Sequence, residues 1–78
     1  MITLKVISPV KEVLSKDVDL VELPGSLCRF EVLKDHAPLI SSLTKGRIRY
    51  VADGLEESIG IESGFVEVKN NTVTVCIE

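Results

Sequence analysis

The sequence predicts an all-β protein, a flattened sandwich or barrel of about eight to ten short and mainly antiparallel strands. Val and Ile contribute 11 and 7 of the 78 residues, whereas only two residues are Ala. β-Branched side chains lose rotamer freedom in helices and pack well on pleated sheets. Turn signals separate the apolar runs at intervals of roughly 8 to 12 residues, as in small sandwiches. No long run keeps the helical period of about 3.6 residues.

Nine strands are expected along the chain, and turn residues mark most of their ends. The first run alternates apolar and polar residues and ends at Ser8-Pro9, because proline cannot donate to a sheet ladder. A later run ends at Pro24-Gly25 in the same way. The expected strands cover residues 3–7, 13–14, 17–23, 29–33, 39–43, 47–51, 55–61, 64–69 and 72–77.

The last four expected strands form two hairpins. Asp53-Gly54 and Asn70-Asn71 lie between the strands of each pair. Asn, Asp and Gly tolerate the positive φ angles that tight hairpin turns require. The chain is therefore expected to fold back on itself at both dipeptides.

Composition and charge exclude several classes of protein. Nine Lys and Arg against twelve Asp and Glu leave a formal charge of −3, which argues against nucleic-acid binding because that needs a basic surface. The longest apolar run is far shorter than the roughly 18 residues of a membrane helix, and no secretion signal is visible at the start. A chain of 78 residues holds one core, so residues 1–78 are expected to form a single domain.

Residues able to carry catalysis or bind metal are few. Cys28 and Cys76 could pair, but one bridge is no disulfide framework, so both are expected to be reduced. Cys28 or Ser41 could use His36, the one histidine, as a base, yet no family signature surrounds them. No metal-ligand spacing and no phosphate-binding glycine motif is present. The expectation is a binding module without catalytic residues, metal or cofactor, whose contacts come from loops.

Several stretches together resemble the epsilon subunit of F-type ATP synthases. The opening residues Leu4 to Pro9 fit its first strand, so the resemblance covers essentially the whole chain. The other matching stretches are Leu23-Pro24-Gly25 with Asp35-His36-Ala37-Pro38-Leu39, Leu43-Thr44-Lys45-Gly46 with Ile48-Arg49-Tyr50, and Ser63 to Val75.

The resemblance implies a β-sandwich that serves as a non-catalytic subunit at the foot of the central stalk. Such a subunit binds the gamma subunit, rests on the c-ring, and couples rotation of the ring to gamma and hence to ATP synthesis. It implies a peripheral position on the cytoplasmic face of the bacterial inner membrane, with membrane contact only through the complex. It implies no cofactor, no small-molecule substrate and no nucleic acid.

The resemblance also assigns residues to two contacts. The loop expected to face the c-ring comprises Ser26, Leu27, Cys28 and Arg29. The residues expected at the gamma interface are Ser8, His36, Ala37 and Ser41. Arg29 stands where the family usually has a carboxylate, so we expect the ring loops of the same organism to carry a compensating acidic residue. The sequence of its c subunit tests this, and a basic loop there would count against the docking.

Members of the family continue into a two-helix hairpin that inhibits ATP hydrolysis in many bacteria. The sequence ends at Glu78, so this hairpin is expected to be absent. Two alternatives remain open on the residues alone. One is an unrelated β adaptor of a larger assembly, and the other is a small enzyme that uses Cys28 or His36.

Overall fold

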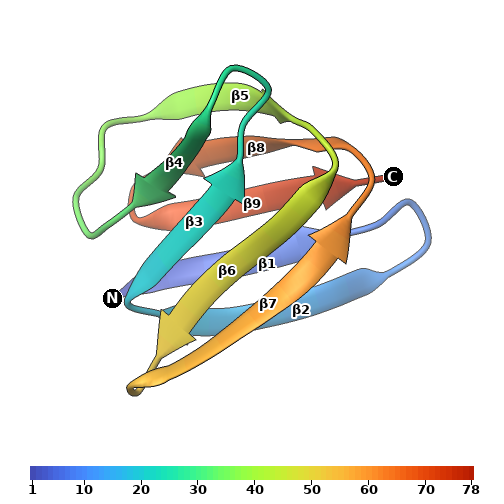
Figure 1. Cartoon of the computed structure of the whole chain (residues 1–78). Coiled ribbons are helices and arrows are strands. Elements are labelled where there is room, and N and C mark those ends of the chain that lie inside the picture. Colours follow the sequence, from blue (N-terminus) through green and yellow to red (C-terminus); the bar gives the residue numbers. More distant parts are fainter.

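The computed structural model describes the whole chain, residues 1–78, as nine strands (Figure 1). It contains no helix that could cross a membrane. The strands are β1 (Ile2–Ile7), β2 (Glu12–Val18), β3 (Leu20–Pro24), β4 (Arg29–Val32), β5 (Leu39–Leu43), β6 (Gly46–Ala52), β7 (Leu55–Ile61), β8 (Gly64–Lys69) and β9 (Thr72–Ile77). The predicted all-β class is confirmed.

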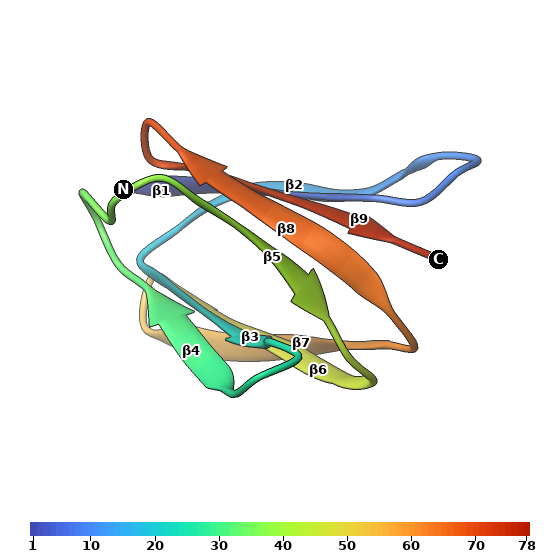
Figure 2. The same ribbon diagram turned by 90° about the horizontal axis from the view of Figure 1, so that it is seen from above.

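The strands form two sheets that face each other as separate layers in Figure 2. One sheet has five strands in the order β2-β1-β9-β8-β5, and the other has four in the order β4-β3-β6-β7. All neighbouring strands are antiparallel except β1 and β9, which run parallel. The molecule measures 27 × 23 × 19 Å, so it is a small and somewhat flattened sandwich.

The core lies between the two sheets and follows the two-residue period of the strands. In β1, Ile2, Leu4 and Val6 are buried, whereas Lys5 between them is exposed. Successive strand side chains point to opposite faces, so each strand sends every second residue inward. Sixteen hydrophobic residues form one buried cluster in this way. Burial of each Val, Leu or Ile side chain contributes about 1.5–3 kcal/mol.

The predicted hairpin turns are present with the expected backbone geometry. Asp53 and Gly54 have φ angles of 53° and 77°, and Asn70 and Asn71 have 50° and 57°. Both central residues therefore lie in the left-handed region, as the tight turns of hairpins require. Asp35, in the predicted turn after β4, also has a positive φ of 63°.

The boundary between β2 and β3 differs from the prediction. The sequence predicts two separate strands over 13–14 and 17–23, whereas the structure has one strand up to Val18 and a corner at Asp19. The Asp19 N–H donates to the carbonyl oxygen of Val51 (2.7 Å) and so fixes the corner. β2 is an edge strand of which only one residue is fully buried. Its alternation of apolar and polar residues is therefore too weak to predict its length.

The two sheets meet where β3 and β5 end. Gly25 forms an isolated bridge with Leu43, and the Thr44 N–H donates to the carbonyl oxygen of Pro24 (2.9 Å). These contacts bring the β3–β4 connection beside the end of β5, at the top of Figure 1. The loop expected to face the c-ring starts at this corner.

Candidate docking surfaces

The connection between β3 and β4 is a short, anchored loop, which we call the tip loop and define as residues 26–28. Gly25 before it is buried, and a Cβ there would lie 2.5 Å from the carbonyl oxygen of Cys28. The Ser26 N–H donates to the Ser42 carbonyl oxygen (3.1 Å), and the two hydroxyl oxygens are 2.8 Å apart. Leu27 at the centre of the loop is fully exposed, and Cys28 is exposed beside it. The sandwich therefore holds the loop from both sides and presents its middle to solvent.

Arg29 follows the tip loop but is bonded within the four-stranded sheet. Its Nε donates to Glu22 Oε1 (2.7 Å), and its Nη2 donates to the carbonyl oxygen of Arg47 (2.7 Å). Glu22 lies opposite Glu31 on β4 and opposite Arg49 on β6. Like charges directly opposite each other are unfavourable, whereas long side chains on a diagonal are within reach. The diagonal contact with Arg29 therefore offsets the Glu22–Glu31 repulsion.

Glu22 is the centre of an ion-pair network on this outer face. Besides Arg29, Arg49 lies 3.5 Å from Glu22 Oε2 and also donates to Glu56 Oε1 (2.9 Å). The hydrogen bonds from Arg29 and then Arg49 hold the pKa of Glu22 below its ordinary value of 4.5. Glu22, Arg29, Arg49 and Glu56 on the outer face of the four-stranded sheet are thus paired with one another.

The four residues expected at the gamma interface do not form one cluster. Ser8 lies in the β1–β2 turn, where its Oγ accepts from the Lys11 N–H (3.2 Å). His36 and Ala37 lie in the β4–β5 loop, and His36 Nδ1 donates to the Ala37 carbonyl oxygen (2.7 Å). Ser41 lies within β5 opposite the buried Val66, so the register places it on the inner side of the sheet, unlike Ile40 and Ser42 beside it. The β1–β2 turn and the β4–β5 loop lie at opposite ends of the five-stranded sheet (Figure 1), and β5 is an edge strand of that sheet.

Two shallow apolar hollows lie beside these residues. One, of about 280 Å³, includes Ser8 in its lining, and the other, of about 340 Å³, includes Pro38 and Ile40, which are neighbours in sequence of Ala37 and Ser41. The first is lined by Ile7, Ser8, Pro9, Phe65, Cys76, Ile77 and Glu78. The second is lined by Pro38, Leu39, Ile40, Glu67, Val68 and Lys69. No local pattern in the sequence indicates these hollows, since each combines strands that are distant along the chain.

The outer face of the five-stranded sheet connects the two hollows. Strand alternation and register place on it Thr3, Lys5, Ile7, Ser15, Asp17, Ile40, Ser42, Phe65, Glu67, Lys69, Thr72, Thr74 and Cys76. None of these residues is in an ion pair, in contrast to the network on the other sheet. Ile40 and Phe65 are 74% and 51% exposed. This face is therefore the less charged and more apolar of the two.

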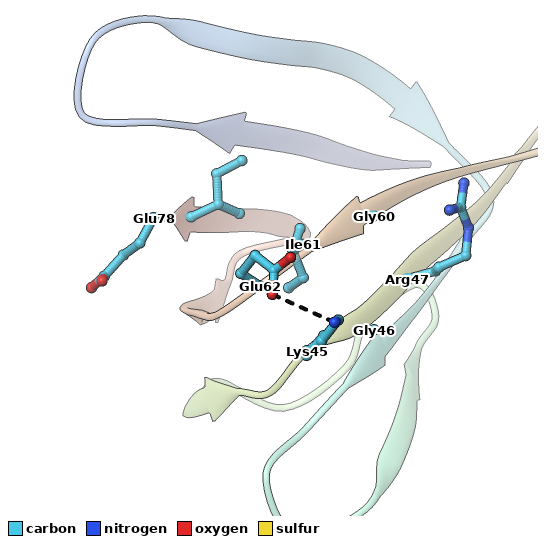
Figure 3. A pocket seen from close by; sticks show the side chains of 8 residues that line it. Lys45, Gly46, Arg47, Gly60, Ile61, Glu62 and Glu78 are labelled. Carbon is cyan, nitrogen blue, oxygen red and sulfur yellow. Dashed lines mark ion pairs between the residues drawn. The ribbon is translucent and has the colours of Figure 1, made fainter.

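The largest hollow in the structure, about 500 Å³, contains none of the predicted site residues (Figure 3). Lys45 and Glu62 approach each other across it from two turns, with Nζ 3.9 Å from Oε2. Arg47 also lines it, but its Nε donates to Ser58 (3.0 Å). Lys45, Arg47 and Glu62 in this hollow thus already have partners within the chain.

Cys28 and His36 do not form a nucleophile–base pair. They flank β4 at its two opposite ends, and the Nδ1 of His36 is bonded to a backbone carbonyl. Cys28 and Cys76 are both free. No group of three or more His, Cys, Asp or Glu side chains is arranged to hold a metal ion.

Every residue of the sandwich lies within the range that matches one known protein family. Residues 1–78 match the family described as ATP synthase, Delta/Epsilon chain, beta-sandwich domain. The chain belongs to this family. Membership agrees with the predicted resemblance to the epsilon subunit and leaves an unrelated adaptor domain without support.

Members of the family with similar sequences come from several bacteria. The ATP synthase epsilon chain of Desulfitobacterium hafniense is 47% identical over 73 residues, which are 94% of this chain and 55% of that protein. The ATP synthase epsilon chain of Citrifermentans bemidjiense is 40% identical over 74 residues, 95% of this chain and 54% of that protein. The chain therefore spans about half the length of these relatives.

Solved structures share the fold of this ATP synthase family domain. A chain in the Euglena gracilis mitochondrial ATP synthase matches with a TM-score of 0.91 at 19% identity, over 97% of this chain and 49% of that chain. A chain in the Tetrahymena thermophila central stalk and c-ring structure matches with a TM-score of 0.81 at 14% identity, over 97% and 62%. At such low identity the likeness shows the fold alone.

Proposed function

We propose that this chain is the β-sandwich part of a non-catalytic epsilon subunit in the central stalk of an F-type ATP synthase. The observation that carries the proposal is the family match over all 78 residues, together with the relatives that are ATP synthase epsilon chains. The solved structures that share the fold are of ATP synthases, and one is of a central stalk with a c-ring.

In this proposal the gamma subunit covers the outer face of the five-stranded sheet. Of the expected contacts, Ser8, His36 and Ala37 lie in turns at the ends of this sheet, and Ser41 lies in its edge strand β5 with its register position on the inner side. The face between them exposes the apolar side chains of Ile40 and Phe65 and includes two hollows. Exposed apolar surface of this kind is typical of protein interaction sites. The outer face of the other sheet is a poorer candidate, because it carries more charged side chains, which would have to be desolvated on binding.

The tip loop contacts the c-ring in the same arrangement. It leaves the sandwich at the corner where β3 and β5 meet, and it borders the five-stranded sheet through its hydrogen bonds to Ser42. A subunit held by gamma on one face and by the ring at the loop passes rotation from one to the other. The densely packed core between the sheets makes the body stiff enough for this role. The subunit is then peripheral to the membrane, on the cytoplasmic side of a bacterial inner membrane.

Capture by purified gamma subunit tests the proposal. We expect stoichiometric capture of the wild-type chain at micromolar concentration. Ile40→Asp, which puts a carboxylate on the proposed face, should weaken capture about tenfold or more, since buried interface anchors often contribute over 1 kcal/mol.

Leu55→Asp is the matched control, because Leu55 is 68% exposed in β7 of the other sheet. It should be captured like the wild type. Absence of capture of the wild type would remove the central-stalk proposal, and equal effects of both variants would remove the assignment of the face.

A further inference from the structure

The tip loop and Arg29 differ in what they offer a partner. Ser26, Leu27 and Cys28 include no Lys, Arg, Asp or Glu. Arg29 is the first charged residue after them, and its guanidinium forms two hydrogen bonds of 2.7 Å, both to groups of the four-stranded sheet. An Arg held by a carboxylate and a carbonyl at once has a fixed direction, because its donors form a rigid fork. Its charge is therefore directed away from the loop.

Charge on the outer face of the four-stranded sheet is also balanced. It carries Glu22, Glu31 and Glu56 against Arg29, Arg47 and Arg49. Glu22 lies within 4 Å of two of these arginines. The chain thus supplies its own acidic partner for Arg29, and no carboxylate of another protein is required to neutralise it.

The middle of the tip loop is apolar and its base is fixed. Leu27 is fully exposed, so its side chain contributes nothing to the packing of this chain. Two hydrogen-bonding contacts with Ser42 and the close packing at Gly25 fix the base of the loop. A preorganised loop loses little entropy on binding, which favours Leu27 as a contact residue.

We propose that the tip loop meets the c-ring through the uncharged pair Leu27 and Cys28, and that Arg29 takes no part in that contact. This inference rests on the proposed function. The partner surface is accordingly one that accepts an apolar side chain, such as backbone and small uncharged side chains of the ring loops, and it needs no acidic residue opposite Arg29. Binding of the ring is then nearly independent of salt.

The test measures binding of the chain, already in complex with gamma, to purified c-ring in detergent. The variants are Leu27→Asp, Arg29→Gln and the control Lys45→Gln, which removes an exposed cation from a nearby turn. Affinities are measured at about 0.1 M and about 1 M salt, which shortens the Debye length from about 10 Å to about 3 Å.

We expect Leu27→Asp to weaken binding about tenfold or more, and Arg29→Gln and Lys45→Gln to stay close to wild type at both salt concentrations. Because the Leu27 side chain packs against nothing, loss of folding cannot account for its effect, and a thermal melt checks this. A tenfold loss with Arg29→Gln and a steep fall of wild-type affinity in salt would overturn the proposal, as would a Leu27→Asp variant that binds normally.

Capture by gamma is measured on the same variants and separates the two proposals. Normal capture by gamma with no binding of the ring would overturn the tip contact while the gamma part of the proposed function stands. Failure of gamma to capture the wild type would overturn the proposed function itself.

Discussion

Gly25 is the residue on which the shape of the tip loop depends. A Cβ at this position would lie 2.5 Å from the Cys28 carbonyl oxygen and 2.9 Å from two ring carbons of Phe30. The loop backbone and the ring would both have to move. We expect Gly25→Ala to lower the free energy of unfolding by about 2 kcal/mol, as overpacking of a filled site does, measured by urea unfolding.

Gly60→Ala provides the matched control for this prediction. Its Cβ would meet only the flexible end of Arg47, at 3.4 Å. The variant should remain within about 0.5 kcal/mol of the wild type. Equal losses in the two variants would contradict the steric account of Gly25.

Glu22 gives the ion-pair network a dependence on pH. Its pKa in the folded chain is lowered below 4.5 by Arg29 and Arg49. A carboxyl group of this kind stabilises the fold above its unfolded pKa, and this contribution is lost as pH falls through the folded pKa. The wild type should therefore be more stable than Glu22→Gln at neutral pH, and the difference should shrink as pH falls below 4.5. Urea unfolding of both proteins over a pH series checks this. A difference in the free energy of unfolding that stays constant as pH falls well below 4.5 would contradict it.

At the scale of elements, the β8–β9 turn also holds the β4–β5 loop. The Asp35 N–H donates to Asn71 Oδ1 (2.6 Å), and Asn71 Nδ2 donates to Asp35 Oδ1 (3.2 Å). Gly tolerates the positive φ of both turn positions, but only Asn71→Gly removes these bonds. We expect Asn71→Gly to be less stable than Asn70→Gly by about 1 kcal/mol, measured by thermal unfolding. Identical stabilities would show that the link between the two loops contributes nothing.

Strands whose ends are marked by turn residues were predictable from the sequence, at the edge of a sheet as well as inside it, whereas the length of β2 was not. Four strands match their predicted residues, because two-residue alternation and turn dipeptides mark both of their ends. They are 39–43, 55–61, 64–69 and 72–77. β2 was divided wrongly because the polar residues Ser15 and Lys16 interrupt its pattern, and no turn dipeptide marks the corner at Asp19 where it ends.

The docking surfaces were also predictable only in part. The tip loop was found through its resemblance to a family, but the Glu22–Arg29 pair depends on the register of β3 against β4. That register depends on the length of the loop between the two strands, which the Pro24-Gly25 signal alone does not give. The hollows beside Ser8 and Pro38 were beyond such reasoning, because they depend on how distant strands pair.

At the scale of the whole molecule, the parallel pairing of β1 with β9 makes the five-stranded sheet and its outer face continuous. It joins the first and last strands, so that Thr3, Thr72 and Lys69 become neighbours across three strands. No local signal in the sequence marks a pairing between such distant segments. Without it the five-stranded sheet would be divided, and the face proposed for gamma would not be continuous.

Thiol labelling tests the proposed arrangement most directly, since Cys28 already lies beside Leu27 in the tip loop. A chain with Cys76→Ser and Ile40→Cys carries one thiol there and one on the proposed gamma face. Maleimide labelling is followed by mass spectrometry for the free chain, for its gamma complex, and for that complex with c-ring. A Ser58→Cys variant reports the outer face of the four-stranded sheet.

We predict that gamma protects position 40 and leaves Cys28 reactive, that the c-ring then protects Cys28, and that position 58 reacts throughout. Unchanged labelling at position 40 in the gamma complex, or protection of Cys28 by gamma alone, would contradict the account.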